Sequence, residues 1–371
     1  MSGLIVHDWL ATTGGSENVV EALVEALPDS DLWTLWNDDR ARFPRARESW
    51  LASTPLRRSR VGAMPLMLPT WRMIPPAGTY DWVLASSHLF AHHAVVDRQQ
   101  DIPKLAYVHT PARYIWSPEI DERGRSLAAQ AVAPMLRQLD RRRAGEITSV
   151  AANSEFVRER IHRAWGIESR VIYPPVNVAL ASSVADWRCQ LEVAEQQVFG
   201  ALPKDFILGA SRFVPYKRLD AVIEVGSTLG IPVVLAGSGP DEARLRRIAD
   251  DAPVPVHFVG RPSDQALYAL YQQALCLVFL AVEDFGIMPV EAMACGTPVM
   301  VGPLGGARES VEMCEGGAVL ETLSPADITD AVQMLDGINR ALLVDRTKFL
   351  SRDRFMSQIN QWLDVTVGSR A

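Results

Sequence analysis

Cysteine is scarce in this sequence of 371 residues, and long apolar runs are absent. No apolar run approaches the roughly 20 residues that a membrane-spanning helix needs. Because residues 1–3 lead directly into an expected strand, we also expect no signal peptide. The cysteines have no spacing typical of a metal site, which favours a reduced, cytoplasmic protein. There are four of them: Cys189, Cys276, Cys295 and Cys314.

Two further absences exclude classes of function. The first strand, residues 4–7, is not followed by G-x-G-x-x-G, which argues against a dinucleotide-dependent dehydrogenase. The net charge is −7 and unevenly spread, with 21 Lys+Arg against 20 Asp+Glu in residues 1–175 and 16 against 24 in the remainder. No overall basic stripe is present, so we expect no nucleic-acid partner.

The length and composition predict two globular domains of similar size. A chain of 371 residues is too long for one ordinary core, and 48% hydrophobic with 22% charged residues is typical of a folded protein. Apolar runs alternate with helical patterns, which predicts α/β domains with doubly wound parallel sheets. The expected parts are a first domain at 1–178, a linker or insert at 179–203, a second domain at 204–354 and a final helix at 355–371.

The stretch at residues 281–298 is central to the expected site. It follows a short apolar strand, and Pro289 suits the first residue of a helix that Gly296 ends. Glu283 would then leave a strand, and Glu291 would lie in the first turn of that helix. Ionised carboxylates accept from vicinal hydroxyls, so the pair suits a polyhydroxylated ligand. The alternative is that Glu291 only complements the helix dipole and Glu283 is solvated.

A second candidate site follows the strand at residues 206–210. Ser211 and Arg212 leave that strand, and Lys217 stands five residues after Arg212 where a helix is expected to begin. A guanidinium and an ammonium on such a loop can converge on one pyrophosphate, assisted by the helix N-terminus. Solvated loop cations are the alternative.

Glycine turns follow other expected strands. Gly14 and Gly15 precede a helical pattern, so backbone N–H groups there could face an anion, unless the segment is only a flexible turn. Gly237 and Gly239 form another turn after a strand. His109 precedes Thr110-Pro111; because proline disfavours helix before it, His109 should end a strand at the ligand-binding edge, or be only a satisfied loop residue.

Residues 57–73 mix arginine, methionine, leucine and tryptophan. Prolines at 65 and 69 are expected to interrupt the segment, so we do not expect one long amphipathic helix. The composition suits an interfacial patch that touches anionic lipid at the inner membrane face. An ordinary core helix with solvated arginines is the alternative. His88, His92 and His93 show no metal arrangement.

The motif Glu283-x7-Glu291 resembles the EX7E signature of retaining nucleotide-sugar glycosyltransferases of family GT4. Its longer wording is similar to bacterial members that build cell-surface polysaccharides, many of them mannosyltransferases. The resemblance covers nearly the whole chain, since His-x-Pro at His109 and R-x4-K at Arg212 also match. It implies the GT-B fold: two Rossmann-like domains facing across a cleft, with a C-terminal helix that crosses back to the first domain.

The resemblance also implies roles for the candidate residues. His109, Glu283, Arg212 and Lys217 would be catalytic, and no metal ligand or cofactor is implied because no Asp-x-Asp motif lies on a suitable loop. The nucleobase edge would meet the backbone near Val259 and Gly260. The residues expected to bind the donor are Gly14, Gly15, Ser211, Arg212, Lys217, Gly237, Gly239, Val259, Glu283, Phe285, Gly286, Ile287 and Glu291.

The implied activity is transfer of a hexose from a nucleotide sugar to a hydroxyl of a glycan or lipid-linked acceptor. The wording of the motif favours GDP-mannose, and a UDP-hexose is the alternative. Two other classes stay open: a nucleotide-sugar-binding partner without catalysis, and a phosphorylase or epimerase of the same architecture. The sequence decides neither the acceptor, the linkage, the pathway nor the oligomeric state.

Overall fold

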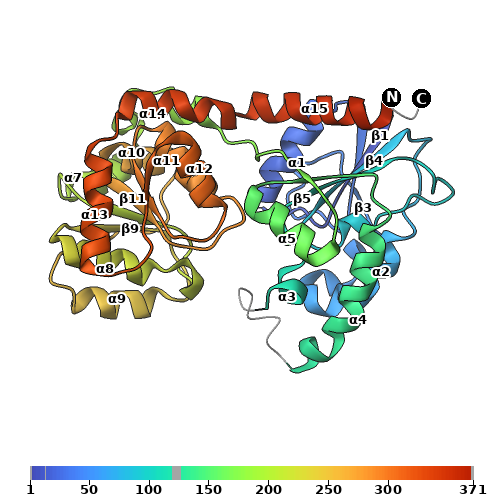
Figure 1. Cartoon of the computed structure of the whole chain (residues 1–371), viewed down its shortest axis with the longest axis horizontal. Coiled ribbons are helices and arrows are strands. Elements are labelled where there is room, and N and C mark those ends of the chain that lie inside the picture. Colours follow the sequence, from blue (N-terminus) through green and yellow to red (C-terminus); the bar gives the residue numbers. More distant parts are fainter. Residues whose placement is uncertain (1, 13, 119–126, 369–371) are drawn as a thin grey trace. The chain divides into compact units, whose positions relative to one another are not determined.

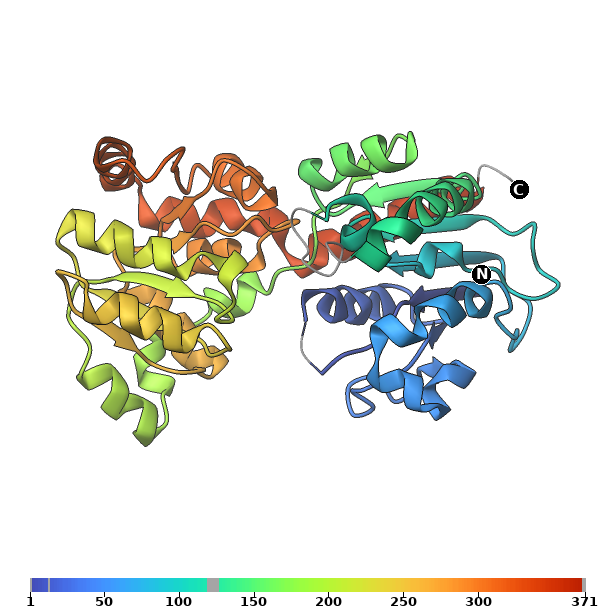
Figure 2. The same cartoon turned by 90° about the horizontal axis from the view of Figure 1, so that it is seen from below.

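The computed structural model describes residues 2–12, 14–118 and 127–368, and the chain divides into two α/β units (Figures 1 and 2). The first unit contains Met1–Pro175 together with Arg352–Ala371, and the second contains Val176–Ser351. Each unit has one sheet whose neighbouring strands all run parallel, with helices on both faces. Two Rossmann-like units of this kind are the GT-B architecture that the sequence predicted.

The first unit is built on a seven-stranded sheet in the order β3-β2-β1-β4-β5-β6-β7. Its central strands are fully buried, as parallel strands covered on both faces should be. The strands are β1 (Gly3–His7), β2 (Ser30–Thr34), β3 (Arg47–Glu48), β4 (Trp82–Ser87), β5 (Lys104–Val108), β6 (Ser149–Ala152) and β7 (Arg170–Val171).

Two cores cover the two faces of this sheet. One contains side chains of α1 and of the C-terminal helix α15, including Phe355 and Trp362. The other contains side chains of α2 and α5. The helices are α1 (Gly15–Ala26), α2 (Arg60–Trp71), α3 (Arg113–Trp116), α4 (Leu127–Ala144), α5 (Glu155–Trp165) and α15 (Arg352–Gly368), with single 3-10 turns at η1 (Trp50–Ser53), η2 (Pro55–Arg58) and η3 (Ala91–His93).

The prediction that prolines interrupt residues 57–73 is wrong. Helix α2 runs through both Pro65 and Pro69 and begins after Ser59, whose side chain accepts from the N–H of Gly62. Tertiary packing overrides the proline penalty, because side chains at four-residue spacing are buried in the core. They are Ala63, Met67 and Trp71.

The second unit has a six-stranded sheet in the order β10-β9-β8-β11-β12-β13. Its strands are β8 (Ile207–Ala210), β9 (Val233–Ala236), β10 (Val256–Phe258), β11 (Cys276–Phe279), β12 (Val299–Val301) and β13 (Gly317–Val319). The helices are α6 (Val178–Ala181), α7 (Val193–Gly200), α8 (Leu219–Leu229), α9 (Glu242–Asp250), α10 (Asp264–Gln273), α11 (Ile287–Ala294), α12 (Gly306–Cys314), α13 (Pro325–Asp336) and α14 (Arg340–Arg346), with 3-10 turns at η5 (Trp187–Gln190), η6 (Pro215–Lys217) and η7 (Thr347–Leu350).

Residues 179–203, which the sequence reading set apart as a linker, belong to the second unit. The indole of Trp187 is buried and lies 5.1 Å from the ring of Tyr268 in α10. Glu195 of α7 accepts from the N–H of Ser263 at the start of α10. The segment therefore packs as part of the α/β unit, and the first unit ends at Pro175 instead of residue 178.

Helix α11 begins earlier than the sequence predicted, and one residue of the expected glycine loop is not among the described residues. Helix α11 begins at Ile287, two residues before Pro289, so Glu291 is its fifth residue and not in its first turn. Thr13, in the expected glycine loop, lies outside the described residues. Among the helices of the described part of the chain, none combines the length and hydropathy needed to cross a bilayer.

Candidate active site

In the loop between β8 and α8, Arg212 and Lys217 both contact the side chain of Tyr216. The guanidinium of Arg212 donates to the hydroxyl of Tyr216 at 2.9 Å. The ammonium of Lys217 lies 5.3 Å from the centre of the same ring and 5.8 Å from that of Phe279. Arg212 is exposed, whereas the Lys217 side chain is only 11% exposed. The two cations that the sequence paired for a pyrophosphate are therefore neighbours.

Lys217 also contacts the first of the two predicted acids. Its ammonium forms a short ion pair with the Oε1 of Glu283, which leaves the carboxyl end of β11. β11 lies next to β8 in the sheet, so the loops after these strands share one edge. The structure thus joins three predicted residues, Arg212, Lys217 and Glu283, into a single group of two cations and one acid.

Glu291 lies in the middle of α11, with its carboxyl largely removed from water. This burial raises its pKa to about 7, and the nearby carboxylate of Asp264 adds to the rise. Glu291 in turn contributes to the raised pKa values of Tyr268 and Tyr271, after the larger effect of their own burial. A carboxyl that titrates near pH 7 can both donate to and accept from a hydroxyl group.

Three loops at this edge of the second sheet are locked together by close backbone approach. The N–H of Gly237 donates to the carbonyl of Gly260 at 2.6 Å. Gly237 has φ 139°, and a Cβ there would lie 1.8 Å from the carbonyl oxygen of Ser211. Only glycine fits this position. Predicted donor-site residues from three βα turns are therefore adjacent, with Gly239 in the same turn as Gly237.

Backbone hydrogen bonds leave only some groups of Val259 and Gly260 available for the predicted contact with a nucleobase. Its N–H already donates to the carbonyl of Leu235 in β9, and the Gly260 carbonyl accepts from Gly237. Among the described residues, the Val259 carbonyl and the Gly260 N–H have no such backbone bond. One acceptor and one donor are left for the edge of a base.

The short stretch before α11 places its N-terminus at the same edge. Gly286 caps the helix with φ 89°, a conformation that favours glycine, and Ile287 is the first helical residue. Phe285 is buried beneath them. Backbone N–H groups in the first turn of a helix are natural partners for a negatively charged or hydroxylated ligand.

In the first unit, the carboxyl ends of β1, β4 and β5 bring three polar side chains into one chain of hydrogen bonds. His7 lies opposite Ser86 in the parallel register. Its Nδ1 lies 2.9 Å from the Ser86 carbonyl oxygen and 3.0 Å from the Ser86 Oγ, which lies 2.8 Å from Nε2 of His109. Burial, together with the nearby rings of His7 and His88, lowers the pKa of His109 well below its ordinary value.

The glycine turn before α1 carries an acid that the sequence reading did not weigh. Gly14 is the residue before the helix and Gly15 its first residue. Glu17, in the first turn, is buried; its Oε1 accepts from the N–H of Ala11 at 3.0 Å and its Oε2 from the Ser16 hydroxyl at 2.9 Å. An anion at the Gly15 N–H would meet a favourable helix terminus and an unfavourable carboxylate together.

Asp8 fixes the turn that follows β4. Its buried carboxylate accepts four backbone N–H bonds, at 2.8 to 2.9 Å, from consecutive residues. This arrangement orients the segment that carries the histidines at the strand ends. The donors are His88, Leu89, Phe90 and Ala91.

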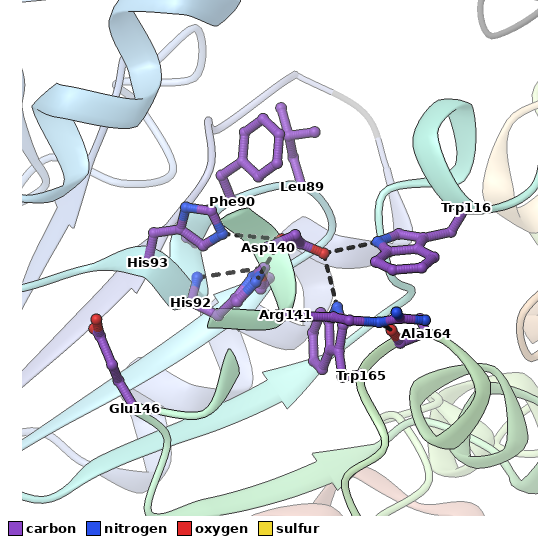
Figure 3. Close-up of polar contacts among 12 residues, drawn as sticks. Leu89, Phe90, His92, His93, Trp116, Asp140, Arg141, Glu146, Ala164 and Trp165 are labelled. Carbon is purple, nitrogen blue, oxygen red and sulfur yellow. Dashed lines mark hydrogen bonds and ion pairs between the residues drawn. The ribbon is translucent and has the colours of Figure 1, made fainter. Parts of the chain in front are cut away.

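A second buried carboxylate, Asp140 of α4, lies below that turn (Figure 3). Its Oδ1 accepts from Nε2 of His92 at 3.0 Å and of His93 at 2.9 Å; its Oδ2 accepts from the indoles of Trp116 and Trp165, both at 2.7 Å. His92, His93 and Asp140 are the only group in the described residues spaced closely enough to hold a metal. The four N–H donors satisfy the carboxylate, and the cluster joins η3, α3, α4 and α5.

Sequence reasoning missed several of these residues. Tyr216, Ser86 and His7 belong to no motif that it weighed, and their role depends on which strands are neighbours. The signal that could have found His7 and Ser86 is positional: His7 is the last residue of a buried strand, Ser86 the last but one of another, and His109 follows a third. Asp140 carried no such signal, because it lies inside a helix and is surrounded by arginines in the sequence.

Known proteins resemble both halves of the chain. A family model for glycosyltransferase family 4 matches residues 13–180, and one for glycosyl transferases group 1 matches residues 194–336. A GDP-mannose-dependent alpha-(1-6)-phosphatidylinositol monomannoside mannosyltransferase of Mycobacterium tuberculosis is 30% identical over 225 residues, covering 56% of each chain. Its namesake in Mycolicibacterium smegmatis is 29% identical over 217 residues, 54% of this chain and 56% of that one. The chain thus aligns with about half the length of these relatives.

Solved structures share the fold over the whole chain. HepE of Anabaena in complex with UDP has a TM-score of 0.73 at 16% identity, covering 98% of this chain and 100% of that chain. Sucrose-phosphate synthase of Thermosynechococcus elongatus has a TM-score of 0.70 at 17% identity and covers both chains completely. With the two family matches in sequence and these neighbours in fold, the chain belongs to the GT-B glycosyltransferases of family 4.

Proposed function

We propose that this protein transfers a hexose from a nucleoside diphosphate sugar to a hydroxyl acceptor, with retention at the anomeric carbon. The observation that carries the proposal is the group formed by Arg212, Tyr216, Lys217 and Glu283. It presents two cations for a diphosphate beside an acid for sugar hydroxyls. Such an arrangement suits a nucleotide sugar better than a free nucleotide or a free sugar.

The chemical roles follow from charge. The bond between the anomeric carbon and the diphosphate oxygen breaks, and its electron pair goes to the diphosphate. Arg212 and Lys217 stabilise that developing negative charge, so we propose that no metal is needed. The acceptor hydroxyl attacks the face that the diphosphate leaves, and its proton passes to the departing phosphate oxygen. Glu283 orients the sugar hydroxyls, Glu291 binds the ribose, and His109 lines the reacting sugar.

The proposed donor is GDP-mannose, and the acceptor a glycan or lipid-linked alcohol. Two relatives named as GDP-mannose-dependent mannosyltransferases support this choice. A UDP-hexose is the second candidate, because HepE of Anabaena is described in complexes with UDP and with UDP-glucose. The free acceptor and donor groups at Val259 and Gly260 suit the edge of either base.

Binding of nucleotides tests the donor. We expect GDP to raise the melting temperature more than UDP, ADP or dTDP, since a ligand at a hundredfold excess over its Kd stabilises the fold by about 2.7 kcal/mol. Hydrolysis of GDP-mannose and UDP-glucose by wild type and by Lys217→Ala then tests catalysis. Equal background rates in both proteins, with GDP still bound, would favour a binding partner without catalysis; activity with phosphate in place of an alcohol would favour a phosphorylase.

Peripheral binding at the inner face of the membrane is a separate part of the proposal. It is supported by the exposed Arg60 and by Met73, which is 73% exposed. The neighbouring Arg57 is already paired with Asp38. Sedimentation with vesicles of anionic and of zwitterionic lipid should separate the two readings of this segment. Binding to neither would leave it as an ordinary core helix.

A further inference from the structure

The hydrogen bonds around Ser86 determine which nitrogen of His7 carries a proton. A backbone carbonyl can only accept, and Nδ1 of His7 lies 2.9 Å from that of Ser86. Nδ1 is therefore the protonated nitrogen of the neutral ring. Nε2 of His7 is buried and forms no hydrogen bond of good geometry among the described residues, although the Trp9 backbone also acts on the ring and raises its pKa. That is consistent with a bare nitrogen, since an unpaired N–H there would lose a bond to water.

The same bonds determine the proton of His109. The His7 N–H also points to the hydroxyl of Ser86, whose Oγ lies 3.0 Å away and acts as acceptor. The hydrogen of that hydroxyl is then directed to Nε2 of His109, 2.8 Å away. Nε2 accepts, so neutral His109 carries its N–H on Nδ1. Within the described part of the chain, Nδ1 of His109 forms no hydrogen bond, and the residue as a whole is 8% exposed.

We propose that Ser86 is a positioning residue which, oriented by His7, holds His109 as the neutral Nδ1–H form, so that the ring offers an N–H donor to an oxygen of the transferred sugar. The inference rests on the proposed function for its catalytic consequence, but the assignment of the proton rests on geometry alone. The parallel register that sets His7 opposite Ser86 builds the relay into the sheet.

A neutral donor at this place has a chemical advantage. The anomeric carbon gains positive charge as a glycosyl bond breaks, and a neighbouring imidazolium would oppose that charge. A neutral N–H can orient a sugar oxygen without adding a positive charge. Protonating His109 would also take away the acceptor of the Ser86 hydroxyl, because both histidines would then donate to the same oxygen.

The next residue provides a matched control. The Ser87 hydroxyl is as buried as that of Ser86 and also bonds to a histidine, with its Oγ 2.9 Å from Nδ1 of His92. In the described chain this hydroxyl has no bond to His109; the backbone N–H of His109 donates to the Ser87 carbonyl at 2.8 Å, a bond that Ser87→Ala keeps. Ser87→Ala therefore removes a comparable hydrogen bond from the same strand without affecting the relay.

The proton assignment is measured without any ligand. In protein labelled with ¹⁵N-histidine, the His109 ring, identified by its loss in His109→Gln, should show a protonated Nδ1 and a bare Nε2. Ser86→Ala should mix the two neutral forms, and Ser87→Ala should leave them unchanged. A protonated Nε2 in the wild type, or the same form in Ser86→Ala as in the wild type, would overturn the inference.

The consequence for catalysis is measured by turnover of GDP-mannose, with water as acceptor. We expect Ser86→Ala to lower kcat about tenfold, the factor for one ordinary hydrogen bond, with little change in KM. Ser86→Thr, which keeps the hydroxyl, should recover most of the loss, and Ser87→Ala should lose little. Wild-type kcat in a folded Ser86→Ala would refute the role. If Ser86→Ala does not fold, Ser86→Thr and the wild-type spectrum still decide the assignment.

Failure of the proposed function would look different. A wild-type protein that keeps the Nδ1–H form but neither binds nor turns over any nucleotide sugar would refute the activity, and with it the catalytic consequence. The proton assignment would stand in that case. The reverse result, an active transferase with a protonated Nε2, would refute the inference and leave the proposed function intact.

Discussion

Lys217 and Glu283 form an ion pair at the edge of the second sheet, although 66 residues separate them in the chain. A carboxylate that holds the ammonium before any ligand binds also competes with a diphosphate for it. The ion pair therefore holds the Lys217 ammonium in position. A bound diphosphate has to share this ammonium with Glu283 or displace Glu283 from it. Because of this contact, replacing either residue also changes the environment of the other, and both replacements can be tested.

Loss of Lys217 should cost turnover more than stability. We expect Lys217→Ala to lower kcat/KM for the nucleotide sugar roughly 10- to 150-fold, the equivalent of about 1.5–3 kcal/mol for a bond to a charged group. Lys348→Ala is the control, because Lys348 is an exposed lysine of the same unit that pairs with Asp345. Steady-state kinetics on both variants measure the effect. Similar losses in the two would remove Lys217 from the phosphate site.

Loss of Glu283 should separate binding from turnover. In Glu283→Ala the ammonium of Lys217 has no competing carboxylate, so we expect GDP to bind about three- to tenfold more tightly, matching about 0.5–1.5 kcal/mol. The rate of hydrolysis of the sugar nucleotide should nevertheless fall, because the carboxylate proposed to orient the sugar hydroxyls is missing. Calorimetry with GDP and kinetics with GDP-mannose give the two numbers. Weaker GDP binding would show that Glu283 supports the phosphate site instead.

Glu291 should make the fold less stable as the pH rises. Its pKa of about 7 lies above the ordinary value of 4.5, so the folded protein holds a proton that the unfolded chain has lost between these values. Stability from this group is complete below pH 4.5 and is lost as the pH passes through 7. Glu291→Gln should therefore gain about 1–3 kcal/mol over wild type at pH 8 and little at pH 4.5. Urea unfolding at both pH values checks the sign.

Asp140 should be a strong determinant of stability in the first unit. In Asp140→Asn an amide NH₂ replaces one carboxylate oxygen. It would face either the two histidine N–H groups or the two indole N–H groups, and that pair of buried donors would lose its acceptor. We expect a loss of about 3 kcal/mol or more in the free energy of unfolding. Asp29→Asn, at an exposed aspartate of the same unit, is the control and should change it by less than about 0.5 kcal/mol. If added Zn²⁺ stabilised wild type but not Asp140→Asn, the cluster would be a metal site after all.

Gly237 should tolerate no side chain. A Cβ at this position would meet the Ser211 carbonyl at 1.8 Å, whereas one at Gly200, in the same unit, would meet nothing within 4 Å. We expect Gly237→Ala to lower both the melting temperature and the affinity for GDP, and Gly200→Ala to change neither. Equal behaviour of the two variants would mean that the three loops adjust independently.

Much of this architecture could be predicted from the sequence, because buried parallel strands are apolar runs and the loops after them carry the polar residues. Glu283, Arg212 and His109 were found that way. The sequence could not show that Tyr216 joins two cations, since that depends on how a 3-10 turn folds back. It also misjudged Pro65 and Pro69, because core packing of α2 outweighs a local preference. The role of Ser86 depends on the register of β1 against β4, which no local pattern specifies.

The turn after β4 is anchored at both ends by acids from distant elements, Asp8 of the loop after β1 and Asp140 of α4. Amide hydrogens of such a turn exchange with solvent only when the anchoring bonds open. Residues 88–91 should therefore exchange as slowly as a central strand, although they belong to no strand. A segment that is irregular in shape would then be among the most rigid parts of the unit.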